Sequence, residues 1–144
     1  MRQHKNENHL YERDFYKWAF TQAELLKNGQ LEKIDLENII EEIECLGRSE
    51  KNALKSQMIR LLKHLLKIEF QPKKHTKSWD NSISQARLKI DRNIDENPSL
   101  KRELEKVMKE AFPYAVKEAS IETSIDIKKF PKECPWTLKE VMGI

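Results

Sequence analysis

Residues 35–72 read DLENIIEEIECLGRSEKNALKSQMIRLLKHLLKIEFQP, and this stretch decides the fold. Its apolar residues recur with the i, i+3, i+4, i+7 spacing that is typical of an amphipathic helix with one face against a core. The two halves stay in register across Gly47, so the pattern predicts either one long helix or two helices that separate at Gly47. The apolar face is wider in the second half, which we expect to be the most buried segment. The stripe comprises Leu36, Ile39, Ile40, Ile43, Leu46, Leu54, Met58, Leu61, Leu65 and Ile68.

A first helix is predicted before this stretch, from about Leu10 to Lys27. It ends at Gly29, because glycine accepts the left-handed conformation that follows a helix at no steric cost. Asp35 is then a good N-cap for the long segment. Residues 1–9 are polar, and we expect them to be disordered or frayed. The predicted inner face of this helix carries Tyr11, Phe15, Trp18, Ala19, Gln22 and Leu25.

Two further helices are predicted after residue 72. One is capped by Thr76 or Ser78 and carries an apolar stripe that begins at Trp79, which we expect in the core. The other starts at Ser99 and contains Pro113, where we expect a kink or a new first turn because proline removes a backbone hydrogen bond.

The last 22 residues differ in character from the rest of the chain. Phe-Pro and Cys-Pro-Trp at residues 130–136 favour an extended segment, and a short helix is expected near Thr137. The sequence therefore predicts an all-α fold. We expect a single helical bundle of four to five helices over residues 10–144, with an extended C-terminal segment that contains proline and tryptophan.

Composition restricts the classes of function. The net charge of +3 is modest for a protein that coats nucleic acid. Charge is nevertheless uneven: residues 30–50 hold seven acidic and two basic residues, and residues 60–92 hold nine basic and three acidic. Cys45 and Cys134 form no Cys-x-x-Cys pair, so we expect reduced thiols in a cytoplasmic protein. No secretory signal or membrane-spanning run is recognised, and no membrane partner is expected.

Several short motifs together resemble a bacterial family of small helical proteins, domain-of-unknown-function family 29 (DUF29). They cover about residues 10 to 142, and it is their combination that is specific. The resemblance implies an all-helical fold and no activity, since the family has no established biochemical function. Pro113 departs from the alanine-rich helix of the family. The matching motifs are Tyr11-x-x-Asp14-Phe15-x-x-Trp18, Asp35-x-Glu37-Asn38-x-x-Glu41-Glu42-Ile43, Leu46-Gly47-Arg48-Ser49-Glu50, His64-Leu65-Leu66-Lys67, Gln71-Pro72, Ser78-Trp79, Pro98-Ser99-Leu100 and Phe130-Pro131-x-x-Cys134-Pro135-Trp136.

Polar residues at the edge of the long stripe are the candidate catalytic group. Glu50 and His64 lie two heptads apart on a continuous helix, and Glu42 falls near the same edge. A carboxylate beside an imidazole can act as an acid–base pair or bind a metal. The alternative is a structural polar network of Glu50, His64 and Arg87, in which buried groups satisfy one another. We expect no metal or cofactor, because the chain has neither a pair of Glu-x-x-His motifs nor His-Glu-x-x-His.

A basic stretch is the candidate surface for a partner. Clustered lysines beside an aromatic ring are the ingredients of a surface that follows phosphates and stacks bases. Solvation of helix exteriors explains the same residues more simply. The candidate residues are Lys63, Lys67, Lys73, Lys74 and Lys77, with Trp79 just beyond.

The sequence leaves three hypotheses for function. The first is a non-enzymatic interaction module that binds protein, either itself or another chain, through a helical face. The second is a protein that binds or processes nucleic acid through the basic stretch 60–79. The third is a metal-dependent hydrolase that uses Glu42, Glu50 and His64.

Overall fold

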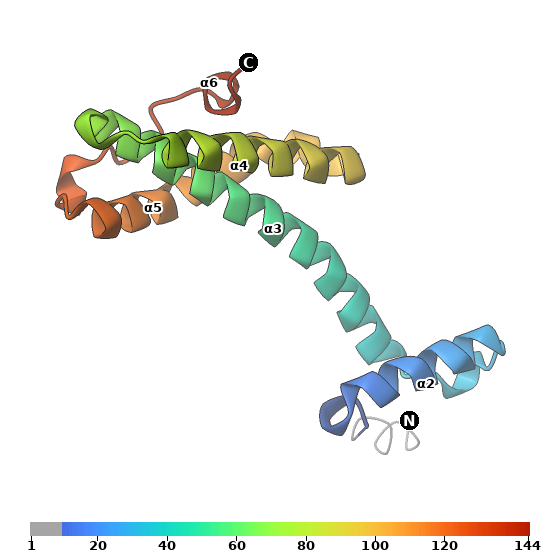
Figure 1. Cartoon of the computed structure of the whole chain (residues 1–144). Helices are drawn as coiled ribbons and strands as arrows, with labels where there is room; N and C mark the ends of the chain where they lie inside the picture. The colour runs from blue at the N-terminus through green and yellow to red at the C-terminus, as the bar shows by residue number, and fades with distance from the viewer. Residues whose placement is uncertain (1–9) are drawn as a thin grey trace. The chain divides into compact units, whose positions relative to one another are not determined.

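The computed structural model describes residues 10–144, where helices are the only regular elements (Figure 1). The predicted all-α class is confirmed. Residues 10–13 are helical, and short 3-10 turns join the later helices at Leu31–Lys33, Pro72–Lys74, Pro98–Glu103 and Ile127–Lys129. Within residues 10–144, every helix is too short or too polar to span a lipid bilayer. The α-helices are α2 (Phe15–Lys27), α3 (Leu36–Phe70), α4 (Lys77–Glu96), α5 (Leu104–Thr123) and α6 (Leu138–Met142).

The long central segment forms one helix, α3, which continues through Gly47. The sequence left one helix or two open, and the structure selects one. Contacts group the chain into two compact units, Met1–Arg48 (unit 1) and Ser49–Ile144 (unit 2), so the division falls within α3. That residues 10–144 behave as a single domain stays a prediction. The expected disorder of residues 1–9 lies outside the described residues.

Unit 1 pairs α2 with the first half of α3. Asp14 interrupts the predicted first helix: its carboxylate accepts a hydrogen bond from the Lys17 amide at 3.0 Å and caps α2. The predicted end is confirmed, because Asn28 follows the last helical residue and Gly29 has φ +69°. The short turn Leu31–Lys33 then leads to Asp35, which directly precedes α3 as predicted.

Unit 2 surrounds the second half of α3 with α4, α5 and the C-terminal segment. Thr76 caps α4 by accepting a hydrogen bond from the Trp79 amide, and is thus the cap among the two predicted, Thr76 and Ser78. The predicted helix at Ser99 starts later, since residues 98–103 form a 3-10 turn and α5 begins at Leu104. The core of unit 2 comprises Leu54, Met58, Leu61, Leu62, Leu66, Ile83, Ala86, Ile90, Leu104, Val107, Met108, Ala111, Phe112, Ala115, Val116, Ala119, Phe130 and Val141.

Helix α5 runs through Pro113 without a new first turn, contrary to one of the two expectations. Proline at this position leaves the carbonyl of Lys109 without its helical hydrogen bond. Both Pro113 and Lys109 lie on the exposed face of α5, where water can bond that carbonyl.

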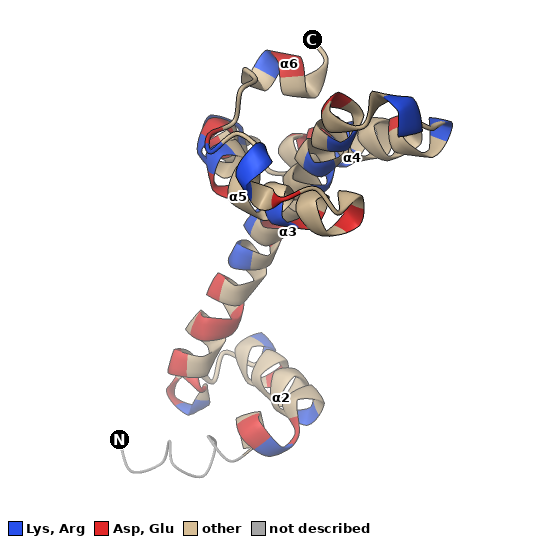
Figure 2. Ribbon diagram, turned by 90° about the vertical axis from the view of Figure 1, so that its left-hand side faces the viewer, with Lys and Arg blue, Asp and Glu red and all other residues tan. Residues whose placement is uncertain are grey.

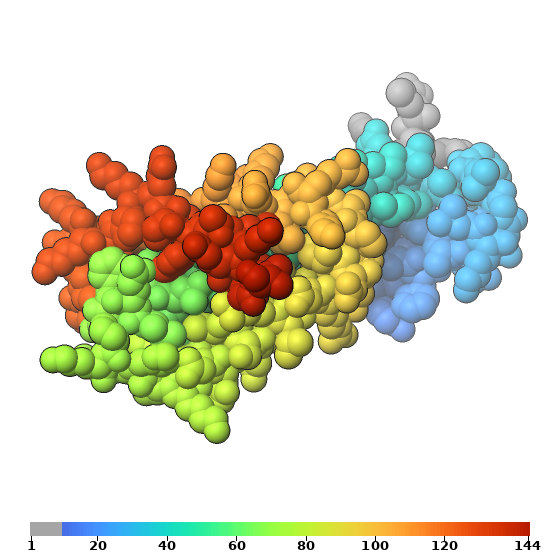
Figure 3. Space-filling view, turned by 90° about the horizontal axis from the view of Figure 1, so that it is seen from above, coloured from blue at the N-terminus to red at the C-terminus, as the bar shows by residue number. Residues whose placement is uncertain are grey.

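The C-terminal segment lies across the rest of unit 2 in the space-filling view (Figure 3). Phe130 is buried and packs on Phe70, with ring centroids 4.7 Å apart. The expected short helix is α6, which begins after Thr137 with a capping box formed by Thr137 and Glu140. Val141 of α6 is fully buried in the core of unit 2.

Candidate docking surface

The first half of the apolar stripe on α3 is exposed in unit 1. Leu36, Ile40, Ile43 and Leu46 retain 55%, 46%, 62% and 70% of their accessible surface. The prediction that they face a core was wrong. Farther along the same helix face, in unit 2, Leu54 and Leu61 are fully buried. We refer to Leu36, Ile40, Ile43 and Leu46 as the exposed stripe.

The stripe stays exposed because α2 packs on a different side of α3. The Trp18 indole Nε1 donates to Asp35 Oδ2 at 3.1 Å, and the Tyr11 hydroxyl donates to Glu42. At about 100° per residue, Glu42 lies roughly a quarter turn around the helix from the stripe. Helix α2 and the helical turn before it are therefore held on the polar side of α3. Among residues 10–48, they leave the stripe exposed apart from Ile39, which is half-buried.

Hydrogen-bonded polar side chains form the interior of the described part of unit 1. Asp35 and Gln22 are almost fully buried, and the Asp35 amide donates to Gln22 Oε1 at 2.7 Å. The Asn38 side-chain amide donates to Asp35 Oδ2 at 2.7 Å. Trp18 is the single buried apolar side chain among residues 10–48. Unit 1 thus has a bonded polar centre where a domain of ordinary size has an apolar core.

Helix α2 adds aromatic residues to the exposed area. Tyr16 is 75% exposed and Phe20 63%, and their ring centroids lie 4.8 Å apart beside an open hollow on the outer face of α2. Together with the exposed stripe and with Phe15, Leu26 and Leu31, they make nine large, exposed apolar side chains among residues 10–48. We call these nine the unit 1 apolar surface: Phe15, Tyr16, Phe20, Leu26, Leu31, Leu36, Ile40, Ile43 and Leu46.

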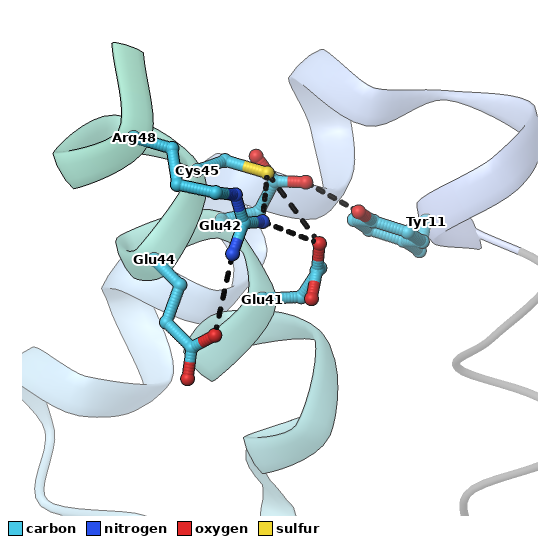
Figure 4. A network of polar contacts seen from close by, with 6 residues as sticks. All are labelled: Tyr11, Glu41, Glu42, Glu44, Cys45 and Arg48. Atoms are coloured by element: carbon cyan, nitrogen blue, oxygen red, sulfur yellow. Dashed lines mark hydrogen bonds and ion pairs between the residues drawn. The ribbon is translucent and has the colours of Figure 1, made fainter. Parts of the chain in front are cut away.

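Acidic side chains border the exposed stripe along α3. Figure 4 shows Glu41 and Glu44 of this border with their contacts to Arg48. Arg48 makes ion pairs with Glu41 at 2.9 Å and with Glu44 at 3.4 Å, and its guanidinium also donates to the Cys45 sulfur at 3.1 Å. One arginine is therefore paired with two carboxylates, so the net charge of this border remains negative. Figure 2 shows the same imbalance along α3, with carboxylates gathered in its first half and lysine and arginine farther along.

Tyr11 is the titratable group that this border perturbs most clearly. Its hydrogen bond to Glu42 raises the pKa of the Tyr11 phenol to about 12, and partial desolvation and the nearby negative charges act in the same direction. The neutral phenol, which can donate, is the form that the folded unit favours.

The three predicted catalytic residues make separate contacts. Glu42 accepts from Tyr11, whereas Glu50 Oε2 accepts from the Asn97 side chain at 3.3 Å. His64 Nδ1 donates to the Arg60 carbonyl at 2.8 Å, and burial lowers the pKa of the imidazole. Among residues 10–144, no three His, Cys, Asp or Glu side chains are grouped so that they could hold a metal ion.

Among residues 10–144, no hydrogen bond or ion pair joins Glu50, His64 and Arg87, which were predicted to form a network. Arg87 Nε donates instead to the Val141 carbonyl at 3.0 Å. A Cβ at Gly143, which has φ +74°, would lie 2.7 Å from the Arg87 guanidinium. Arg87 therefore holds the end of α6, where a cation also complements the helix dipole.

The basic stretch divides into two groups. Lys63 pairs with Glu118 at 3.6 Å and Glu122 at 3.3 Å, and Lys67 lies 4.6 Å from the centre of the Trp79 ring. Trp79 is half-buried beside this lysine and outside the core, contrary to our expectation. The remaining lysines are exposed and have no ion-pair partner within residues 10–144: Lys73, Lys74 and Lys77.

Sequence reasoning missed the unit 1 apolar surface, although two signals pointed to it. Tyr16 and Phe20 lie outside the predicted inner face of the first helix, so that helix carries aromatic residues on two sides. Several of the seven acidic residues between positions 30 and 50, Glu37, Glu41 and Glu44 among them, also border a stripe that was assigned to the core. Large aromatic residues on an outer face are typical of surfaces that bind a partner.

Comparison with known protein families found one match. The model of a family described as "Domain of unknown function DUF29" matches residues 10–143. Comparisons with curated proteins and with solved structures found no match.

Proposed function

We propose that this chain, which belongs to the DUF29 family, is a non-enzymatic interaction module that docks a protein partner on the unit 1 apolar surface. The family is described as one of unknown function, so the proposal is drawn from the geometry. As expected from the sequence, we place this module in a bacterial cytoplasm, where the thiols of Cys45 and Cys134 stay free.

The observation that carries the proposal is the imbalance in unit 1 between exposed and buried apolar side chains. Nine large apolar side chains are exposed among residues 10–48, and one, Trp18, is buried. A unit of this size buries too little apolar surface to be stable without further support. Contact with a partner protein would remove the exposed groups from water and supply that support.

The amount of exposed area fits a protein interface. From their exposed fractions, the nine side chains offer on the order of 1,000 Å² to solvent. One side of a standard interface buries about 800 Å². Tyr16 and Phe20 lie on the outer face of α2 and the exposed stripe lies on α3, so this area is spread over more than one exposed patch. Exposed apolar patches of several hundred Å² mark sites of interaction.

Site-specific photo-crosslinking in the native cells tests the proposal. A benzophenone amino acid replaces Ile43 or Phe20 of unit 1 in separate variants, and Ile121 of unit 2, which is 79% exposed, in a control. We expect a discrete protein adduct from Ile43 and Phe20, whether to another protein or to a second copy, and none from Ile121. Adducts of equal yield at all three positions, or none at Ile43 and Phe20, would contradict the proposal.

A further inference from the structure

We propose that the exposed stripe of α3 binds a basic amphipathic helix of another protein, with the apolar face of that helix on Leu36, Ile40, Ile43 and Leu46. This inference rests on the proposed function and specifies the chemistry of the partner. The argument uses the spacing of the stripe, the way the same face of α3 is covered in unit 2, and the charge beside the stripe.

The spacing of the stripe fits a helix. Its residues follow one another at four, three and three positions along α3, so they form a ridge about three turns long, roughly 15 Å. An apolar ridge of this kind takes a second helix through contacts at i, i+3, i+4 and i+7. An isolated small ligand would leave most of such an open ridge in water.

The second half of α3 shows how this helix face is covered within unit 2. There Leu54, Met58 and Leu61 are fully buried in a cluster that includes Ile90 of α4 and Val107 of α5. The cover is therefore the apolar faces of other helices. The first half continues the same pattern of residues, and we infer the same kind of cover for it.

The charge beside the stripe selects the partner. Residues 30–50 hold seven acidic residues against two basic ones, Lys33 and Arg48. Of the acidic residues, Asp35 is buried, Glu42 bonds Tyr11 and Glu50 belongs to unit 2, so the charge beside the stripe comes from a smaller group. Glu37, Glu41 and Glu44 recur at helical spacing along one edge of the stripe, and Arg48 is already paired with two of them. A second copy that packs antiparallel would place acidic edge against acidic edge, which costs free energy. One that packs parallel would leave the acidic edge without an opposite charge from Glu37, Glu41 or Glu44 of the other copy. Lysine or arginine flanking an apolar face would instead meet opposite charge.

Fluorescence anisotropy with two designed peptides tests the inference on the full-length chain. Both peptides are helical, of about 18 residues or five turns. They share one leucine face, which is flanked by lysine in one peptide and by glutamate in the other. At about 150 mM salt, where distant charges are largely screened, we expect the lysine peptide to bind at least about tenfold more tightly than the glutamate peptide.

Variants separate docking from non-specific attraction between opposite charges. Ile43→Asp adds a negative charge, so a purely electrostatic contact with the lysine peptide would strengthen. A docked helix loses an apolar contact instead, and we expect binding to weaken by about tenfold or more. Ile121→Asp adds the same charge on unit 2 and is the matched control, for which we expect unchanged affinity. Leu46→Gln removes a stripe contact without adding charge and is expected to weaken binding as Ile43→Asp does.

Three results would overturn the inference. The first is binding of the glutamate peptide as tight as that of the lysine peptide, and the second is binding that survives both Ile43→Asp and Leu46→Gln. The third is a dimer in solution, seen by light scattering, that Ile43→Asp dissociates, since a second copy would then cover the stripe. If one of these results is obtained but crosslinks still form at Ile43 in cells, the proposed function stands and only the assignment of a basic helix as the partner is wrong. If crosslinks and peptide binding are both absent, the proposed function fails as well.

Discussion

Tyr11 shows how one hydrogen bond fixes the ionisation of a side chain in unit 1. The carboxylate of Glu42 accepts a hydrogen bond from the phenol hydroxyl, and this bond raises the pKa of Tyr11 to about 12. Because the folded pKa lies above the ordinary value of 10.0, the bond stabilises unit 1 below about pH 10 and is lost as pH rises through 12.

We expect a late phase in the ultraviolet titration of the tyrosines of the folded protein, with a pKa of about 12. Glu42→Ala removes the acceptor and its charge, and should move this phase to lower pH. Tyr11→Phe should abolish the phase altogether. A late phase that persists unchanged in both variants would mean that the bond between Tyr11 and Glu42 does not form.

His64 has the opposite dependence on pH. Burial lowers the pKa of its imidazole, and the neutral ring donates from Nδ1 to the Arg60 carbonyl. Nearby Lys63 and Lys67 lower the pKa further, whereas Glu122 raises it. A base whose folded pKa lies below the unfolded value of 6.5 contributes stability above that value, and the contribution is lost as pH falls toward the folded pKa.

Urea unfolding between about pH 7.5 and pH 5 measures this contribution. We expect the free energy of unfolding to decrease as the pH falls, and the decrease to be smaller in His64→Gln, which cannot titrate. The other described histidine, His75, contacts Asp80 at 2.6 Å and is present in both proteins, so the comparison isolates His64. An equal decrease in the wild type and in His64→Gln would show that other groups cause the dependence on pH.

At the scale of the element, α3 carries one apolar pattern along its length, but the residues of that pattern are mostly exposed in unit 1 and mostly buried in unit 2. Leu61 is fully buried in the core of unit 2, whereas Ile43 is 62% exposed in unit 1. The hydrophobic pattern sets which residues share a face, but it does not determine whether a neighbouring element covers that face. The cover depends on where α2 attaches, and α2 attaches through Asp35 and Glu42 on a polar side.

Truncation at the two positions should therefore have different costs. Leu61→Ala removes buried methyl groups and leaves a cavity, so we expect a loss of about 2–5 kcal/mol in the free energy of unfolding. Ile43→Ala removes exposed groups and should change it by less than about 0.5 kcal/mol. Urea denaturation of the two variants and the wild type makes the comparison. A loss of about 2 kcal/mol or more in Ile43→Ala would mean that the chain itself covers the stripe.

At the scale of the whole molecule, the sequence predicted several helix ends but neither the break at Asp14 nor the later start of α5, and it did not predict the surroundings of the helices. The end of α2 at Gly29, the cap of α4 at Thr76 and the start of α6 after Thr137 follow from local chemistry, and all three were predicted. The division of the described chain into two units depends on contacts between distant residues, and no local pattern reports it.

The candidate sites show the same limit. Helical spacing placed Glu50 and His64 at one edge of α3, but their hydrogen bonds go to Asn97 of the α4 end and to the carbonyl of Arg60. Arg87 was expected in a network with Glu50 and His64, whereas its Nε donates to the Val141 carbonyl, from a segment 54 positions away. Spacing along one helix cannot identify partners that come from another element.

The central claim is that the exposed stripe is a docking surface for a basic helix, and amide hydrogen exchange of the full-length chain tests it most directly. With the lysine peptide bound, we predict slower exchange in residues 36–46 and unchanged exchange around Ile121. The glutamate peptide should change neither region. Protection around Lys73 and Lys74 in place of residues 36–46, or no protection at all at saturating lysine peptide, would contradict the account.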